Sequence, residues 1–115
     1  MAGHLTTHAL DTALGCGARG LRVEIRRIAP DPEGPHTVVL DENGRGILIA
    51  PPDLRVGRYE LTFFVAEYHR QQGVSLEDPP FFSQIVVQFA IGRQDTDYHV
   101  PILFSPYGYS TYRGG

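Results

Sequence analysis

LRVEIRRIAPDPEGPHTVVLDENGRGILIA, residues 21–50, is a run of short strand patterns separated by turn sequences. In LRVEIRRI (21–28) apolar residues alternate with Arg and Glu, which predicts a strand with one face on a core and one in water. PDPEGP (30–35) predicts a turn, because closely spaced Pro and Gly cannot continue a β ladder. HTVVLD (36–41) is then a second strand, and we expect it to form a hairpin with the first.

The same alternation of strand and turn continues in both directions. ENGRG (42–46) contains Asn-Gly, a strong signal for a tight turn because both residues tolerate positive φ. ILIA (47–50) is a short strand that PPD ends. Toward the N-terminus, the residues around His8 in TTHALD (6–11) favour β structure, whereas GCGARG (15–20) reads as a loop.

One helix interrupts the strands. GRYELTFFVAEYH (57–69) is rich in β-branched and aromatic residues, and we expect a strand over 58–66. AEYHRQQG (66–73) predicts two turns of helix with Gly73 at the C-terminal stop.

Three further strand patterns follow, FFSQIVVQFAIG (81–92), YHVPILF (98–104) and YGYSTY (107–112). Proline has no N–H to give to a ladder, so we expect Pro101 in an edge strand or at a bulge. Many short strands at roughly ten-residue spacing predict an all-β Greek-key sandwich. With 115 residues, we expect one domain over 1–115.

The composition and charge of the chain limit the kinds of partner that we expect it to bind. The net charge is −3 and the pI is near 5.9, which argues against nucleic acid and gives no reason to expect an anionic membrane. Residues 1–11 show neither a signal-peptide pattern nor a basic lead, so we expect a cytoplasmic protein. Cys16 is the only cysteine, and we expect a free loop thiol there, with a catalytic thiolate as the alternative.

The five histidines show no spacing typical of a metal site, so we expect no metal. His36 and His69 fall in polar surroundings that predict exposed side chains. His8 and His99 each lie in a strand pattern, and Arg45 lies in the Asn-Gly turn. Taken singly, each of these three is compatible with a structural or solvated role.

Three segments resemble one family, the transthyretin-related 5-hydroxyisourate hydrolases. They are LTTHALDTALGCGARGLRVEI (5–25), ENGRG (42–46) and YHVPILFSPYGYSTYRGG (98–115). The family's marks are an H-V-L-D-T segment, a G-R turn and a terminal Y-H-V-P-L-L … S-P-Y-G-Y-S-T-Y-R-G-S. Transthyretin shares the fold but lacks the paired histidines and the Y-R-G-S ending, so the hydrolase branch is favoured.

The resemblance assigns roles to six residues. The family's catalytic histidines fall on His8 and His99, and its arginine, which binds substrate, falls on Arg45. Its terminal Tyr-Arg-Gly falls on Tyr112, Arg113 and Gly114, which we expect to contribute to substrate binding. The chain departs from the pattern at Ala9 (family Val), Gly17 (family Pro, a change expected to loosen a loop) and Gly115 (family Ser).

The resemblance also implies an assembly and a reaction. It implies a transthyretin-like eight-stranded sandwich that forms a homotetramer, a dimer of dimers. It implies ring opening of 5-hydroxyisourate to 2-oxo-4-hydroxy-4-carboxy-5-ureidoimidazoline, with a histidine-activated water and no cofactor. Two alternatives stay open: a carrier that binds a planar aromatic ligand without catalysis, and a purely structural sandwich domain.

Overall fold

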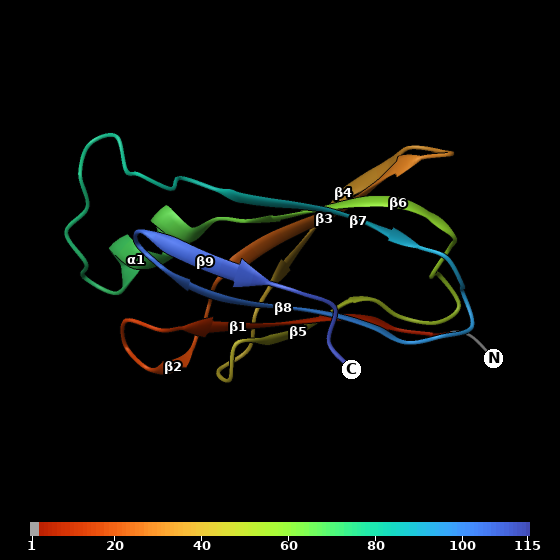
Figure 1. Cartoon of the computed structure of the whole chain (residues 1–115), viewed down its shortest axis with the longest axis horizontal. Coiled ribbons are helices and arrows are strands. Elements are labelled where there is room, and N and C mark those ends of the chain that lie inside the picture. The colour runs from red at the N-terminus through yellow and green to blue at the C-terminus, as the bar shows by residue number, and fades with distance from the viewer. Residues whose placement is uncertain (1–2) are drawn as a thin grey trace.

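The computed structural model describes residues 3–115 as two β-sheets packed face to face, with a short helix at one end (Figure 1). The strand patterns of the sequence are confirmed, with boundaries shifted by a few residues. The elements are β1 (Leu5–Asp11), β2 (Cys16–Gly17), β3 (Arg22–Ala29), β4 (Glu33–Val39), β5 (Arg45–Ile49), β6 (Gly57–Phe63), α1 (Val65–Gln71), β7 (Ile85–Ile91), β8 (Tyr98–Ser105) and β9 (Gly108–Thr111).

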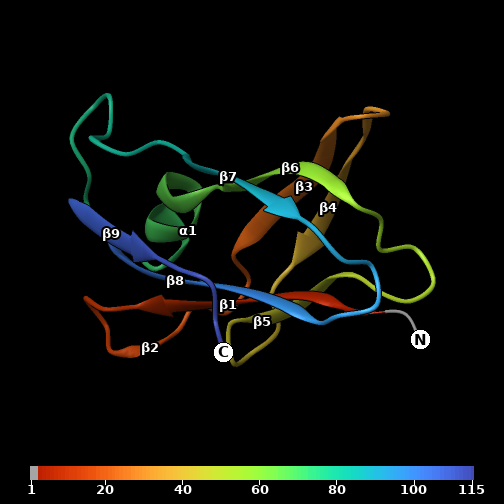
Figure 2. The same ribbon diagram turned by 45° about the vertical axis from the view of Figure 1, so that its right-hand side comes forward.

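One sheet joins the two ends of the chain. Its strand order is β2-β1-β8-β9, and β5 pairs with the first half of β1. The β1–β8 pair is parallel, from Leu5 opposite Tyr98 to Asp11 opposite Phe104. β1 therefore has β5 on one side and β8 on the other, which places three segments far apart in sequence side by side (Figure 2).

The second sheet has the order β4-β3-β6-β7, and all its pairs are antiparallel. The hairpin expected for residues 21–41 is the β3–β4 pair. The Asn-Gly turn leads from β4 in this sheet to β5 in the other. Only its glycine, Gly44, has positive φ (76°), and a Cβ there would lie 2.5 Å from the Ala9 carbonyl oxygen.

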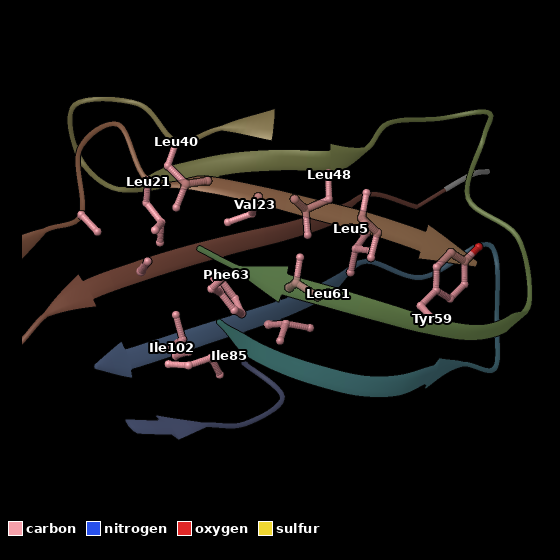
Figure 3. Close-up of a cluster of buried hydrophobic side chains, with 14 of the residues drawn as sticks. Leu5, Leu21, Val23, Leu40, Leu48, Tyr59, Leu61, Phe63, Ile85 and Ile102 are labelled. Carbon is pink, nitrogen blue, oxygen red and sulfur yellow. The ribbon is translucent and has the colours of Figure 1, made fainter. Parts of the chain in front are cut away.

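The core lies between the two sheets (Figure 3). Along β1, every second side chain is buried, beginning at Leu5, while the side chains between them are only half-buried. Because strand side chains alternate between faces, Thr6 and His8 lie on the face of the sheet that points away from the core. Fully buried side chains from both sheets fill the space between them, among them Leu5, Val23, Leu61, Phe63, Ile85 and Ile102.

Two features of the first sheet differ from expectation. β2 falls in the segment that reads as a loop, and it pairs Leu10 with Gly17. The prediction that Pro101 lies in an edge or bulged strand is wrong, because β8 runs between β1 and β9. The proline is tolerated because the β8–β9 ladder begins only at Ile102, opposite Thr111, so that β9 has already ended beside Pro101.

The helix α1 differs from expectation in one side chain. Gly73, with φ 80°, follows the helix end as predicted. The prediction that His69 is solvated is wrong, because only 1% of it is exposed. The helix packs its Tyr68 and His69 rings against Phe104 of β8, and the Tyr68 hydroxyl donates to the buried carboxylate of Asp11. The polar residues beside His69 in the sequence therefore gave no indication that one face of this short helix is buried.

Burial lowers the pKa of His69, and its Nε2 has no hydrogen-bond partner. The unfolded chain therefore binds a proton more readily, so stability falls as the pH drops below the ordinary imidazole value of about 6.5. We expect His69→Phe to reduce the loss of unfolding free energy between pH 7.5 and 5.5, measured by urea denaturation. One proton contributes at most about 1.4 kcal/mol per pH unit.

The matched control is His36→Phe, because His36 is exposed on β4. It should leave the pH dependence of unfolding as in the unmodified protein. An equal pH dependence in the His69 and His36 variants would contradict the assignment of this effect to the buried ring.

Candidate active site

His8 and Arg45 lie directly opposite each other on β1 and β5. The turn before Arg45 is held by Asp41, whose Oδ1 accepts hydrogen bonds from the backbone N–H groups of Asn43 (2.8 Å) and Arg45 (3.0 Å). These two bonds lower the pKa of Asp41, which keeps the carboxylate ionised. The turn therefore fixes where the Arg45 side chain leaves the sheet.

His99 lies on β8, on the other side of β1 from Arg45. Its register partner is Thr6, and its Nδ1 is 2.8 Å from the Thr6 hydroxyl oxygen. His99 is half-buried between the buried residues Tyr98 and Val100. By the alternation of strand side chains, it lies on the same outer face as Thr6 and His8.

An open hollow of about 680 Å³ lies on this face. Its polar lining comes from three strands and the turn, and its apolar lining comes from the end of β4 and from β5. The lining residues are Thr6, Thr7, Val38, Val39, Asp41, Arg45, Gly46, Ile47 and His99. A hollow with apolar walls and a few convergent polar groups is typical of a small-molecule site.

Burial lowers the pKa of His99, and the positive charges of His8 and Arg45 lower it further. The nearby main chain of Thr6 acts in the opposite direction but does not reverse the shift. The His99 imidazole is consequently neutral at neutral pH and can accept a proton. The Nε2 of His8 is 3.1 Å from the carbonyl oxygen of Asn43.

The C-terminal tail folds back onto His99. The N–H of Gly114 donates to the His99 carbonyl oxygen at 2.8 Å, and a Cβ at position 114 would lie 2.6 Å from the imidazole Cδ2. Only glycine allows the tail to lie this close to the ring. Gly114 is thus brought to the site, whereas Gly115 is exposed with nothing within 4 Å of where its Cβ would lie.

Tyr112 and Arg113 lie apart from the hollow that contains Arg45. They line a second hollow of about 250 Å³, between β7 and the tail, which His99 also borders. The Arg113 guanidinium stacks over the Tyr98 ring, 4.5 Å from its centroid, and Tyr112 is 56% exposed. The structure therefore places Arg45 and His99 at one hollow, His8 opposite Arg45, and Gly114 against His99. Tyr112 and Arg113 share only the second hollow with His99.

Three contacts of the site were not predicted from the sequence. The sequence could have indicated Thr6, because Thr6 lies two positions before His8 and therefore on the same face of one strand. Asp41 precedes Asn-Gly in a pattern that favours an Asx turn. The Asn43 carbonyl depends on Gly17, where any Cβ would overlap it, so glycine at 17 permits close packing and does not loosen a loop.

Within residues 3–115 no group of His, Cys, Asp and Glu side chains is arranged to hold a metal ion. Cys16 is exposed on β2 and forms no disulfide. In the same part of the chain, no helix has the length and apolar character needed to cross a membrane.

Two facing sheets, with imidazole and guanidinium groups around a hollow on the outer face of one of them, define a β-sandwich protein with a candidate small-molecule site. The model of the HIUase/Transthyretin family matches residues 5–114, and the chain belongs to this family.

Named relatives cover nearly the whole chain. It is 46% identical to 5-hydroxyisourate hydrolase 2 of Rhizobium meliloti (strain 1021), over 98% of this chain and 97% of that protein. It is 43% identical to the 5-hydroxyisourate hydrolase of Pseudomonas aeruginosa, over 97% and 91%.

Solved structures agree on the fold. The Klebsiella pneumoniae 5-hydroxyisourate hydrolase superposes with a TM-score of 0.81 at 30% identity, covering 98% of this chain and 99% of that one. An (S)-allantoin synthase superposes with a TM-score of 0.90 at 38% identity, and the match covers 99% of this chain but 44% of that longer one. Sea bream transthyretin, at 24% identity and a TM-score of 0.81, shows the shared fold alone.

The His99 environment makes a prediction for its titration. We expect NMR to give His99 a pKa below the ordinary value of about 6.5. Arg45→Ala should raise it by removing one positive charge, whereas Arg45→Lys should not. Arg58→Ala, which removes an exposed arginine on β6, is the control and should leave it unchanged. A wild-type pKa at or above 6.5 would contradict the geometry described for the site.

Proposed function

We propose that this protein hydrolyses 5-hydroxyisourate to 2-oxo-4-hydroxy-4-carboxy-5-ureidoimidazoline, a step of urate breakdown. The observation that carries the proposal is that Arg45 and His99, from strands on either side of β1, line one hollow, while His8 on β1 lies directly opposite Arg45. Near-full-length relatives named 5-hydroxyisourate hydrolase support the choice of substrate.

The reaction forms a bond between the oxygen of water and a ring carbonyl carbon, and breaks the adjoining C–N bond of the six-membered ring. A neutral imidazole takes the proton of the attacking water, and a proton is returned to the leaving nitrogen. A positioned base of this kind contributes roughly 10²- to 10⁴-fold to the rate. Because His99 is held neutral by its surroundings, it suits this task.

Arg45 supplies the charge that the reaction needs. As the water attacks, negative charge develops on the carbonyl oxygen, and a guanidinium can donate two parallel hydrogen bonds to it or to a neighbouring oxygen. The planar fork of arginine matches a flat, oxygen-rich ring better than the ammonium of lysine does. No cofactor is required by this mechanism.

The tail and the assembly complete the proposed site. Gly114 lets the tail close against His99. For Tyr112 and Arg113 to bind substrate, it would have to extend into the second hollow, which these residues line with His99. We propose a homotetramer, a dimer of dimers, of single 115-residue domains. β7 and β9 are the outermost strands of their sheets, and unpaired strand edges are suited to pairing with another copy.

We propose that the protein is cytoplasmic. A reduced Cys16 needs no oxidising compartment, which is consistent with this location.

The test follows the decay of ultraviolet absorbance of freshly generated 5-hydroxyisourate. The wild-type protein should accelerate it well beyond buffer, and His99→Asn should lower kcat/KM by roughly 10²- to 10⁴-fold. His36→Asn, which changes an exposed histidine on β4, should retain full activity.

Decay with the wild type no faster than in buffer would end the enzyme proposal. If the substrate analogue urate still binds in that case, and His8→Ala or His99→Ala weakens the binding, the carrier alternative holds. Gly115→Ser should raise turnover or leave it unchanged, since an added Cβ at position 115 would lie within 4 Å of nothing.

A further inference from the structure

The hydroxyl of Thr6 lies against one nitrogen of the His99 ring and leaves the other free. Thr6 Oγ1 is 2.8 Å from His99 Nδ1, and within residues 3–115 His99 Nε2 makes no hydrogen bond. We propose that Thr6 is a positioning residue that holds the neutral His99 imidazole with its proton on Nδ1, so that the Nε2 lone pair faces the substrate. This inference rests on the proposed hydrolase function.

One neighbouring acceptor, the carbonyl oxygen of Tyr98, indicates the direction that we infer for the Thr6–His99 bond. A hydroxyl has one proton to donate and lone pairs to accept with, and a neutral imidazole has one N–H and one lone pair. Thr6 Oγ1 donates to the carbonyl oxygen of Tyr98, at 3.5 Å. With its proton directed there, Oγ1 presents a lone pair to Nδ1, and the ring proton on Nδ1 completes the 2.8 Å hydrogen bond.

His8 is held at the opposite nitrogen. Its Nε2 faces the Asn43 carbonyl, so this nitrogen carries a proton in every charge state of the ring. The two imidazoles thus differ: Nε2 of His8 is a fixed donor, whereas Nε2 of His99 is a free acceptor. Gly114 adds a restraint on the His99 backbone through its hydrogen bond to the carbonyl oxygen.

The variants that isolate this effect are Thr6→Val, which keeps the shape but loses the hydroxyl, and Thr6→Ser, which keeps the hydroxyl. Thr37→Val, at an exposed position of β4, is the matched control. Long-range ¹H–¹⁵N spectra read the tautomer of each histidine without substrate, and steady-state kinetics give kcat and KM separately.

We expect the wild-type and Thr6→Ser proteins to hold His99 as the Nδ1–H tautomer. In Thr6→Val the ring should populate both tautomers, and kcat should fall about 2- to 10-fold, the worth of one net hydrogen bond, with KM little changed. The acid limb of kcat/KM should also move in Thr6→Val and return in Thr6→Ser. Thr37→Val should have the same His99 tautomer, kcat and KM as the wild type.

An Nε2–H tautomer in the wild type would overturn the inference, and so would unchanged tautomer and kcat in Thr6→Val. If Thr6→Val does not fold, the wild-type tautomer alone decides. If the wild-type protein has the Nδ1–H tautomer but does not hydrolyse 5-hydroxyisourate, the proposed function is contradicted, whereas the positioning of His99 by Thr6 is not.

Discussion

The parallel pairing of β1 with β8 is the constraint on which the site depends. It sets residues from the start of the chain beside residues nearly a hundred positions later, from Leu5 opposite Tyr98 to Asp11 opposite Phe104. A buried threonine strengthens it, since the Thr7 hydroxyl donates to the Val100 carbonyl oxygen at 2.7 Å. A slip of one residue would turn every side chain of one strand to the opposite face. His99 would then point into the core, away from His8 and Arg45.

The core protects this register. The inward residues of β1 and β8 are almost fully buried against the second sheet (Figure 3). Burying each large apolar side chain among them, such as Leu5 and Ile102, contributes roughly 1.5–3 kcal/mol, and a shifted register would lose most of that stabilisation. Apolar packing on one face therefore holds the polar groups of the other face in place. Arg45 joins them because β5 pairs with the remaining edge of β1.

Much of the fold could be predicted from local sequence patterns, because alternation, Asn-Gly and Gly73 act over a few residues. The errors arise where a distant neighbour decides. His69 is buried because α1 packs on Phe104, and Pro101 fits an inner strand because β9 stops one residue earlier. The two-residue β2 exists only through its pairing with β1.

The site could not be assembled from local patterns at all. His8, Arg45 and His99 were singled out through a family resemblance, since their separate patterns are compatible with ordinary structural roles. Their convergence depends on strand pairing between distant segments, which periodicity does not specify. Thr6 is the exception, because strand alternation alone places it beside His8.

The binding site can be tested with a crystal structure of the protein with urate, a planar oxygen-rich purine related to 5-hydroxyisourate. We expect the ring in the hollow above β5, β1 and β8, with an oxygen within hydrogen-bond distance of Arg45 and an edge facing His99 Nε2. Urate bound instead between β3 and β5, in the cleft lined by Ile25, Arg27 and Tyr59, with the hollow at His99 empty, would contradict it.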